Sequence, residues 1–141
     1  MDNLKLSNQA CFPLYALSRV LTAHYKPILE EVELTYPQYL VMLVLWEHNE
    51  LSVKAIGEHL LLDSGTLTPL LKKLEGKNLV SRVRNEADER MVLVSLTKDG
   101  ISLKERATNI PESFKCSLGL SVEEMVTLRD ITNTILQKLN K

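Results

Sequence analysis

The sequence has 141 residues, 45% of them hydrophobic and 25% charged, with a formal net charge of -1, which is typical of one folded domain and excludes a generally basic nucleic-acid binder. The longest apolar run, residues 39–46, is far shorter than the about 20 residues that cross a bilayer, and we expect no signal peptide. Without an export signal, a chain with two cysteines is predicted to lie in the reducing cytoplasm and not in a membrane. The three histidines show no metal-ligand spacing near the cysteines, so we expect no metal and no cofactor.

The first long helix is predicted over residues 7–31, because apolar side chains recur there at helical spacing. These side chains are Leu14, Leu17, Leu21, Tyr25 and Ile28. Cys11 lies near the start of this helix, where free N–H groups and the positive end of the helix dipole favour a thiolate. The residues alone allow two interpretations of Cys11, as a small buried hydrophobic residue or as a reactive sulfur.

A second helix is predicted to begin near Thr35, with Pro37 in its first turn, where a missing N–H is tolerated. Its sequence is apolar on nearly all sides, which predicts a central buried helix. Met42 and Trp46 are therefore expected in the core.

Two shorter helices follow, one over residues 53–60 with Ser52 as its N-cap, and one over residues 65–76. The second has an apolar face made of Leu67, Leu70, Leu71 and Leu74. Its opposite face is small and polar at first and basic further along, and consists of Gly65, Thr66, Thr68, Pro69, Lys72 and Lys73.

The start of this second short helix decides how Pro69 is accommodated. If Asp63 is the N-cap, Pro69 lies in the helix interior, where a proline costs about 3 kcal/mol. If the helix begins nearer Thr66, that cost disappears. The sequence is compatible with both arrangements.

Two short, partly alternating β-branched segments, residues 79–85 and 91–97, flank a charged turn and predict a β-hairpin. Thr97 can cap a helix over residues 98–110, which Pro111 interrupts or restarts. A capping box from Ser121 to Glu124 opens the last helix. The apolar face of that last helix consists of Met125, Leu128, Ile131, Ile135 and Leu139.

Two short helices followed by a hairpin are the order of a winged helix-turn-helix. We therefore predict a mainly α fold with a small β-hairpin wing, in a single domain over residues 1–141. Residues 35–97 would form the DNA-binding region, and residues 1–34 and 98–141 would form helices that pair with a second copy of the chain.

Charge supports contact with double-stranded DNA, because residues 64–84 contain five basic residues and one acidic residue, a local charge of +4. These are Lys72, Lys73, Lys77, Arg82 and Arg84, with Glu75. Small and hydroxyl side chains at the start of the helix, Ser64 among them, let the backbone approach DNA. Arg90, at the hairpin tip, can reach a minor groove, and Asp88 can orient its guanidinium.

Several segments resemble a known family. The sequence "DER" at 88–90, with "VLVSLTKDG" after Met91, resembles the wing of the MarR family of dimeric winged-helix regulators. The segments "CFPLYALSR", "LTYPQYLVMLVLWE" and "LDSGTLTPLLKKLE" more narrowly resemble the organic hydroperoxide resistance regulators. The resemblance extends from about residue 8 to residue 135.

The resemblance implies a homodimeric repressor that binds inverted-repeat operators and is not an enzyme. It identifies Cys11 as a thiol sensing organic hydroperoxide, with Tyr25 and Tyr36 as hydrogen-bond donors to its thiolate. Tyr15 matches a tyrosine of some members, and Cys116 matches the resolving cysteine of a two-cysteine subgroup, which forms an intersubunit disulfide.

Other functions fit parts of the sequence. In a MarR-type regulator that responds to a small aromatic ligand, the thiols would be bystanders. A thiol peroxidase is disfavoured because the chain lacks a CxxC motif and strand–helix alternation. Basic helix faces are often only solvated, and a winged helix can serve protein contacts alone. Small-molecule thiols, rather than Cys116, can also cap an oxidised Cys11.

Overall fold

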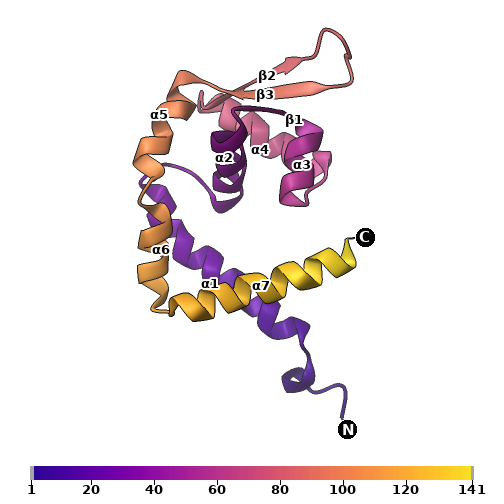
Figure 1. The fold of residues 1–141 in the computed structure, drawn as a ribbon, viewed down its shortest axis with the longest axis vertical. Coiled ribbons are helices and arrows are strands. Elements are labelled where there is room, and N and C mark those ends of the chain that lie inside the picture. Colours follow the sequence, from indigo (N-terminus) through magenta and orange to yellow (C-terminus); the bar gives the residue numbers. More distant parts are fainter. Residues whose placement is uncertain (1, 141) are drawn as a thin grey trace.

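The structure is a computed structural model that describes residues 2–140. In chain order its elements are η1 (Leu6–Asn8), α1 (Cys11–Glu30), α2 (Tyr36–His48), β1 (Glu50–Ser52), α3 (Val53–Leu60), α4 (Ser64–Gly76), β2 (Val80–Arg84), β3 (Val92–Leu96), α5 (Lys98–Ala107), α6 (Ile110–Leu118) and α7 (Val122–Leu139). Figure 1 shows α2, α3, α4 and the sheet gathered at one end, with the hairpin projecting from it. The predicted mainly helical fold with a hairpin wing is confirmed.

Helix α2 is the centre of the core, as its uniformly apolar sequence predicts. Thr35 and Gln38 form a capping box at its start, in which Thr35 Oγ1 accepts from the Gln38 N–H and Gln38 Oε1 accepts from the Thr35 N–H. Met42 is fully buried, and buried Trp46 donates from Nε1 to the Gly100 carbonyl at 2.8 Å. This last bond joins α2 to the start of α5.

Helices α3 and α4 form the helix-turn-helix, and both begin at the side-chain caps expected of such sequences. Ser52 Oγ accepts from the Ala55 N–H, and Asp63 Oδ1 accepts from the Thr66 N–H at 2.7 Å. Asp63 is thus the N-cap of α4, and Pro69 lies inside the helix. The question left open by the sequence is settled in favour of the longer helix.

The predicted hairpin is confirmed, with β2 and β3 antiparallel and Arg82 opposite Val94. A third strand, β1, pairs with the other edge of β3, so that the sheet order is β1-β3-β2. Strand β1 was not predicted from the sequence, because three residues are too few to show an alternating pattern.

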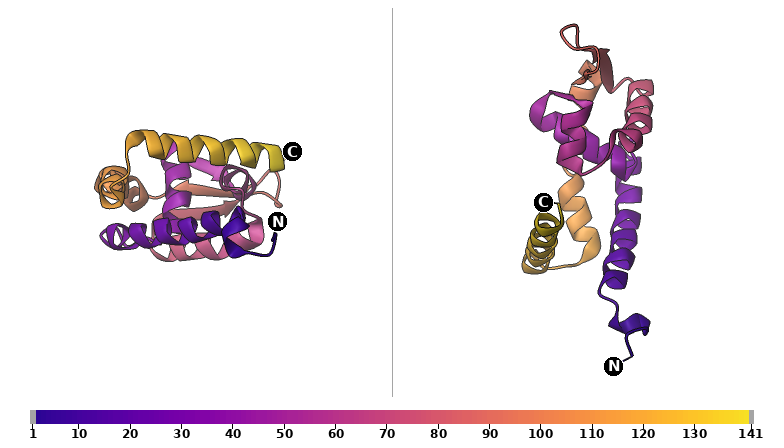
Figure 2. Two further views of the ribbon diagram at one scale, coloured as in Figure 1. Left: turned by 90° about the horizontal axis from the view of Figure 1, so that it is seen from below. Right: turned by 90° about the vertical axis from the view of Figure 1, so that its right-hand side faces the viewer.

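The terminal helices differ in detail from the prediction. Helix α1 begins at Cys11 rather than at residue 7, because residues 6–8 form a separate turn of 3-10 helix. A new helix, α6, begins at Ile110 with Pro111 in its first turn, and it packs against α1. Helix α7 crosses α1 in Figure 1, but Figure 2 shows the two helices well separated.

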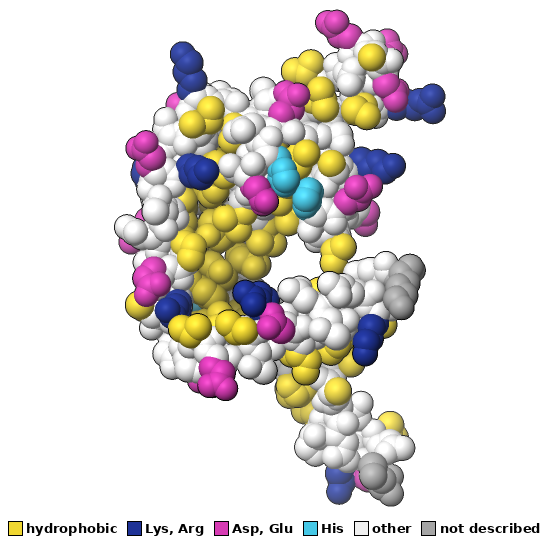
Figure 3. Space-filling model, in the orientation of Figure 1, with side chains coloured by type: hydrophobic (Ala, Val, Ile, Leu, Met, Phe, Trp, Pro, Cys, Tyr) yellow, Lys and Arg dark blue, Asp and Glu magenta, His cyan; other side chains and the backbone are white. Residues whose placement is uncertain are grey.

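Apolar side chains of the terminal helices remain exposed in the single chain. Among the residues that the structure describes, α7 buries none. Figure 3 shows apolar side chains lining the hollow between α7 and the winged-helix end. Exposed apolar residues of α1 and α7 include Phe12, Leu14, Val20, Val122, Ile131, Ile135 and Leu139. Exposed apolar surface of this extent is typical of a face that contacts another protein chain.

Candidate functional site

The outward face of α4 is positioned as its periodicity predicts. Leu67, Leu71 and Leu74 are fully buried and fix the orientation of the helix about its axis. The opposite face leaves Ser64, Gly65, Thr66, Pro69, Lys72 and Lys73 exposed, with Thr68 half-buried. The backbone N–H of Thr66 holds the pKa of Asp63 below its usual value, so the capping side chain is a carboxylate at neutral pH. Small residues followed by lysines therefore project from the start of an ordered helix.

Two of the five basic residues counted in the local charge are committed to other contacts. Arg82 Nη2 donates to Glu75 Oε1 at 3.1 Å, and the Arg82 N–H donates to Glu75 Oε2 at 3.2 Å. The hydrogen bond from the Arg82 side chain holds the pKa of Glu75 below its usual value. Lys77 Nζ donates to the Glu33 carbonyl and to Gln38 Oε1. The predicted local charge of +4 is unchanged, because Glu75 was already counted against Arg82 and the partners of Lys77 are neutral oxygens. Lys72, Lys73 and Arg84 are the exposed basic residues of this segment whose side chains are offered to a duplex.

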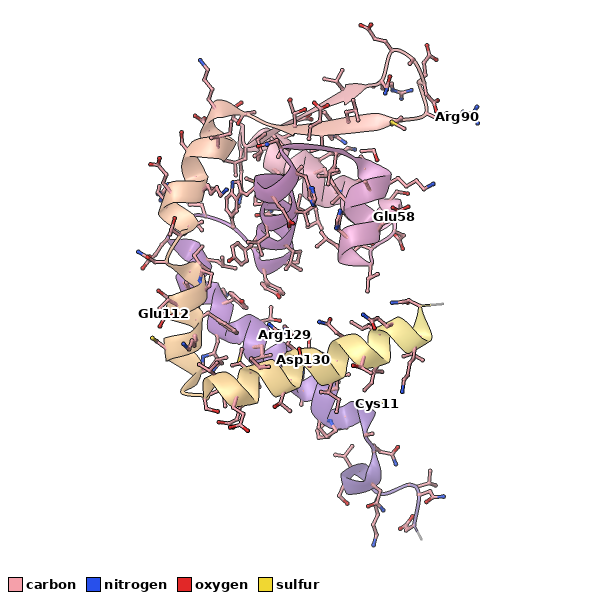
Figure 4. The ribbon with its side chains drawn as sticks, in the orientation of Figure 1. Cys11, Glu58, Arg90, Glu112, Arg129 and Asp130 are labelled. Atoms are coloured by element: carbon pink, nitrogen blue, oxygen red, sulfur yellow. The ribbon has the colours of Figure 1, made fainter. Side chains whose placement is uncertain are left out.

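Arg90 lies at the outer end of the hairpin, where Figure 4 shows it pointing away from the rest of the chain. Its side chain is 97% exposed, and its Nε lies 3.8 Å from Asp88 Oδ1. Asp88 Oδ1 also accepts from the Arg90 N–H at 3.1 Å. The Asn85 N–H donates to the Met91 carbonyl at 2.7 Å and closes the turn. Asp88 therefore steadies an arginine that is otherwise in solvent.

A groove of about 980 Å³ separates the hairpin from the helix-turn-helix. Its lining includes Ser64 and Thr68 of α4 together with Asp88 and Arg90 of the hairpin. The two elements expected to contact DNA thus face one concave surface.

Cys11 is exposed and is the first residue of α1. No side chain of the described residues caps this helix start, and its first turn contains no acidic residue. In this turn Cys11 and Phe12 carry backbone N–H groups, whereas Pro13 has none, and the positive end of the helix dipole also lies next to the sulfur. Tyr15, one turn further along, carries the Arg19 guanidinium 4.8 Å above its ring.

Tyr25 and Tyr36 meet each other but do not meet Cys11 within one chain. Their ring centroids are 4.6 Å apart, and Tyr25 also stacks on Phe114 of α6 at 3.7 Å. Burial, with smaller contributions from Tyr36 and Tyr39, raises the pKa of Tyr25, so its hydroxyl stays a neutral donor. Tyr25 follows Cys11 by fourteen residues on the same helix, which is about 21 Å.

Cys116 lies on α6, far from Cys11 of the same chain. Its Sγ is 3.8 Å from Glu112 Oε1, and the two labels Cys11 and Glu112 are well apart in Figure 4. The next residue, Ser117, contacts His24 of α1, with Oγ 3.4 Å from Nδ1. His24 follows Cys11 by thirteen residues, about 20 Å along the helix. A disulfide needs Cα atoms within about 7 Å, so the two cysteines of one chain cannot join in this arrangement.

Within residues 2–140, no group of three or more His, Cys, Asp or Glu side chains is placed to hold a metal ion. None of the described helices is both long enough and apolar enough to span a membrane.

Both a family model and individual relatives identify the chain as similar to transcriptional regulators. The model of the family "Transcriptional regulator SarA/Rot" matches residues 23–107, more than half of the sequence. An organic hydroperoxide resistance transcriptional regulator of Bacillus subtilis is 52% identical over 143 residues, which cover 99% of this chain and 95% of that protein.

Solved structures of AbfR, from Staphylococcus epidermidis, are also similar. Reduced AbfR bound to DNA is 36% identical, with a TM-score of 0.80, and the match covers 99% of this chain and 98% of that one. Disulfide-formed AbfR is 34% identical, with a lower TM-score of 0.66, covering 99% and 96% of the two chains. The described chain thus resembles the reduced, DNA-bound form of that regulator more than its disulfide form.

Proposed function

The chain belongs to the SarA/Rot and MarR-type transcriptional regulators, in their organic hydroperoxide resistance branch, and from that premise we propose that it is a redox-sensing repressor released from DNA by oxidation of Cys11. It is a regulator rather than an enzyme. One observation carries the redox part of the proposal. Cys11 is exposed at an uncapped helix start, in a chain 52% identical to an organic hydroperoxide resistance regulator.

The proposed chemistry begins at the Cys11 sulfur. Its thiolate attacks a peroxide oxygen, so that an S–O bond forms, the O–O bond breaks, and the leaving alkoxide takes a proton to become an alcohol. Sulfur loses two electrons and becomes a sulfenic acid, and the peroxide gains them. The thiol of Cys116 of the partner subunit then attacks that sulfur, forming a disulfide and releasing water.

The distances within one chain support a partner in this step. About 20 Å of helix separates Cys11 from Tyr25 and from the residues around Cys116 in the same chain. The tyrosine hydroxyls and the second thiol that we assign to the site would therefore come from the partner subunit. The exposed apolar faces of α1 and α7 are suited to pair with a second copy. In such a homodimer, Tyr25, Tyr36 and Cys116 would be supplied to Cys11 across the interface, whereas Tyr15 lies one turn from Cys11 on the same α1.

The proposed DNA-binding surface combines α4 and the wing. The residues offered to a duplex are Ser64, Gly65, Thr66, Thr68, Pro69, Lys72, Lys73, Arg84, Asp88 and Arg90. Two copies related by a twofold axis would place two α4 helices on the half-sites of an inverted repeat, about one helical turn apart. We place the protein in the cytoplasm, where bacterial DNA lies. Oxidation would change the spacing of the two α4 helices, and the dimer would leave DNA.

The first test uses a non-reducing denaturing gel after one equivalent of cumene hydroperoxide. Wild-type protein is expected to give a covalent dimer of about twice the 16.0 kDa monomer mass. Cys11→Ser and Cys116→Ser are each expected to stay monomeric, because each lacks one of the two sulfurs.

The other outcomes separate the alternatives. Oxidised Cys11 without a covalent dimer would indicate that Cys11 acts alone or is capped by small thiols, which contradicts the role given to Cys116. A Cys11 that remains a free thiol would contradict redox sensing and favour a regulator that responds to a small aromatic ligand. Sustained consumption of peroxide would instead indicate a thiol peroxidase.

Arg90→Ala is expected to weaken DNA binding by about tenfold, because it removes an arginine that a narrow minor groove attracts, and the loss of one arginine contact to DNA costs roughly 1–3 kcal/mol where it has been assigned to a base. The probe is a duplex selected from a random-sequence pool by the reduced wild-type protein, called here the selected duplex. Lys73→Ala is expected to weaken binding and to flatten its salt dependence, because a phosphate contact is lost. Unchanged affinity of either variant over a range of salt concentrations would contradict that residue's assignment.

A further inference from the structure

The carboxyl end of α1 is joined to the end of α4 by one side chain. Lys77 is the C-cap residue of α4, and its Nζ donates to the carbonyl of Glu33, just beyond α1. The same amine donates to Oε1 of Gln38, in the first turn of α2, at 3.0 Å. Lys77 thus contacts the turn between α1 and α2 from a third helix.

The acceptors of Lys77 are held firmly. Gln38 is 2% exposed, and its Oε1 also accepts from the Thr35 N–H at 3.1 Å in the capping box. Glu33 has left-handed backbone angles, with φ of 56°, and the Leu34 N–H returns to the Leu29 carbonyl at 3.1 Å. Because both acceptor oxygens are fixed in the turn, displacement of the turn also displaces the Lys77 side chain that is hydrogen-bonded to them.

The end of α1 also needs positive charge from outside its own sequence. The last turn of α1 contains no basic residue, although the carboxyl end of a helix carries partial negative charge. Lys77 and Arg106 supply that charge from α4 and α5, Arg106 through Nη2 to the Glu31 carbonyl at 2.6 Å. Both cations therefore have defined partners at the carboxyl end of α1.

We propose that Lys77 is a positioning residue that transmits displacement of α1 to the DNA-reading helix α4, an inference that rests on the proposed function. Helix α1 has 20 residues and is about 30 Å long, with Cys11 at one end and the Lys77 contact at the other. Its main packing partners are α2 and α6. Tilting of α1 on oxidation moves the turn at residues 31–35, and Lys77 carries that motion to α4.

The test compares Lys77→Met in its reduced and oxidised forms on the selected duplex. Lys77 is exposed, so the variant is expected to fold, and reduced affinity should stay within about twofold of wild type. The loss of affinity on oxidation should shrink by roughly fivefold or more. Intact-mass measurement establishes that Cys11 is oxidised to the same extent. Lys77→Arg should restore the wild-type response, and Lys138→Met, in α7, is the charge-matched control.

Each other outcome overturns a definite statement. If oxidation releases Lys77→Met as fully as it releases wild type, the role of Lys77 is wrong and the proposed function stands. If reduced Lys77→Met binds weakly with a flatter salt dependence, Lys77 is a phosphate contact and the inference also fails. If wild-type protein stays on DNA while its Cys11 is oxidised, the proposed function fails and the inference fails with it.

Discussion

Replacing Cys11 with serine is expected to leave the protein on DNA after an organic hydroperoxide is added, whereas wild type is released with an affinity loss of about tenfold or more. Serine keeps the size of the side chain, but its hydroxyl is not ionised at neutral pH and does not attack the peroxide. Fluorescence anisotropy of the selected duplex, before and after cumene hydroperoxide, measures the effect directly. Reduced Cys11→Ser should bind as wild type does, because Cys11 lies on α1 and far from α4.

The second cysteine provides the matched control for this experiment. Cys116→Ser retains the sensing thiol and should still form a sulfenic acid, but it cannot complete the intersubunit disulfide. Its release from DNA should therefore be smaller than that of wild type, or reversed more readily by added thiol. Full release of Cys11→Ser by the hydroperoxide would contradict the sensing role, and would leave ligand binding as the reason for release.

Caps and turns were predictable from sequence because the groups that form them are close in the chain. The capping box from Ser121 to Glu124 was predicted and is present, and the helix predicted to begin near Thr35 begins with a second box, between Thr35 and Gln38. The apolar face of α4 was likewise predictable, because its leucines recur at helical spacing.

Contacts between residues far apart in sequence were not predictable in the same way. A count of charges between residues 64 and 84 does not show that Lys77 binds the turn after α1, 44 residues earlier. The resemblance pairs Cys11 with Tyr25 and Tyr36, and the observed length of α1, which agrees with the predicted helix, separates Cys11 from Tyr25 of the same chain by about 21 Å. The same length moves the proposed site from one chain to an interface between two.

Gly100, in the first turn of α5, contacts both α2 and the segment that links β3 to α5. Its N–H donates to Thr97 Oγ1 at 3.0 Å in the cap of α5, and its carbonyl accepts from Trp46 Nε1. A Cβ added at Gly100 would lie 2.1 Å from the carbonyl oxygen of Leu79, which itself accepts from the Thr97 N–H. The obstacle is backbone, and it cannot move aside without breaking the junction of β2 and α5.

Gly100→Ala is accordingly expected to lower the free energy of unfolding by about 3 kcal/mol, at the upper end of the usual cost of overpacking. Gly76→Ala, at the last residue of α4, is the control, because an added Cβ there meets no described atom within 4 Å. Alanine at that position should be neutral or stabilise by up to about 1 kcal/mol. Urea unfolding followed by circular dichroism, at one protein concentration, compares the two variants. If the free energies of unfolding of the two variants differ by less than about 1 kcal/mol, the backbone between β2 and α5 shifts to accept the added methyl group. The close approach of Gly100 to Leu79 would then not constrain the fold.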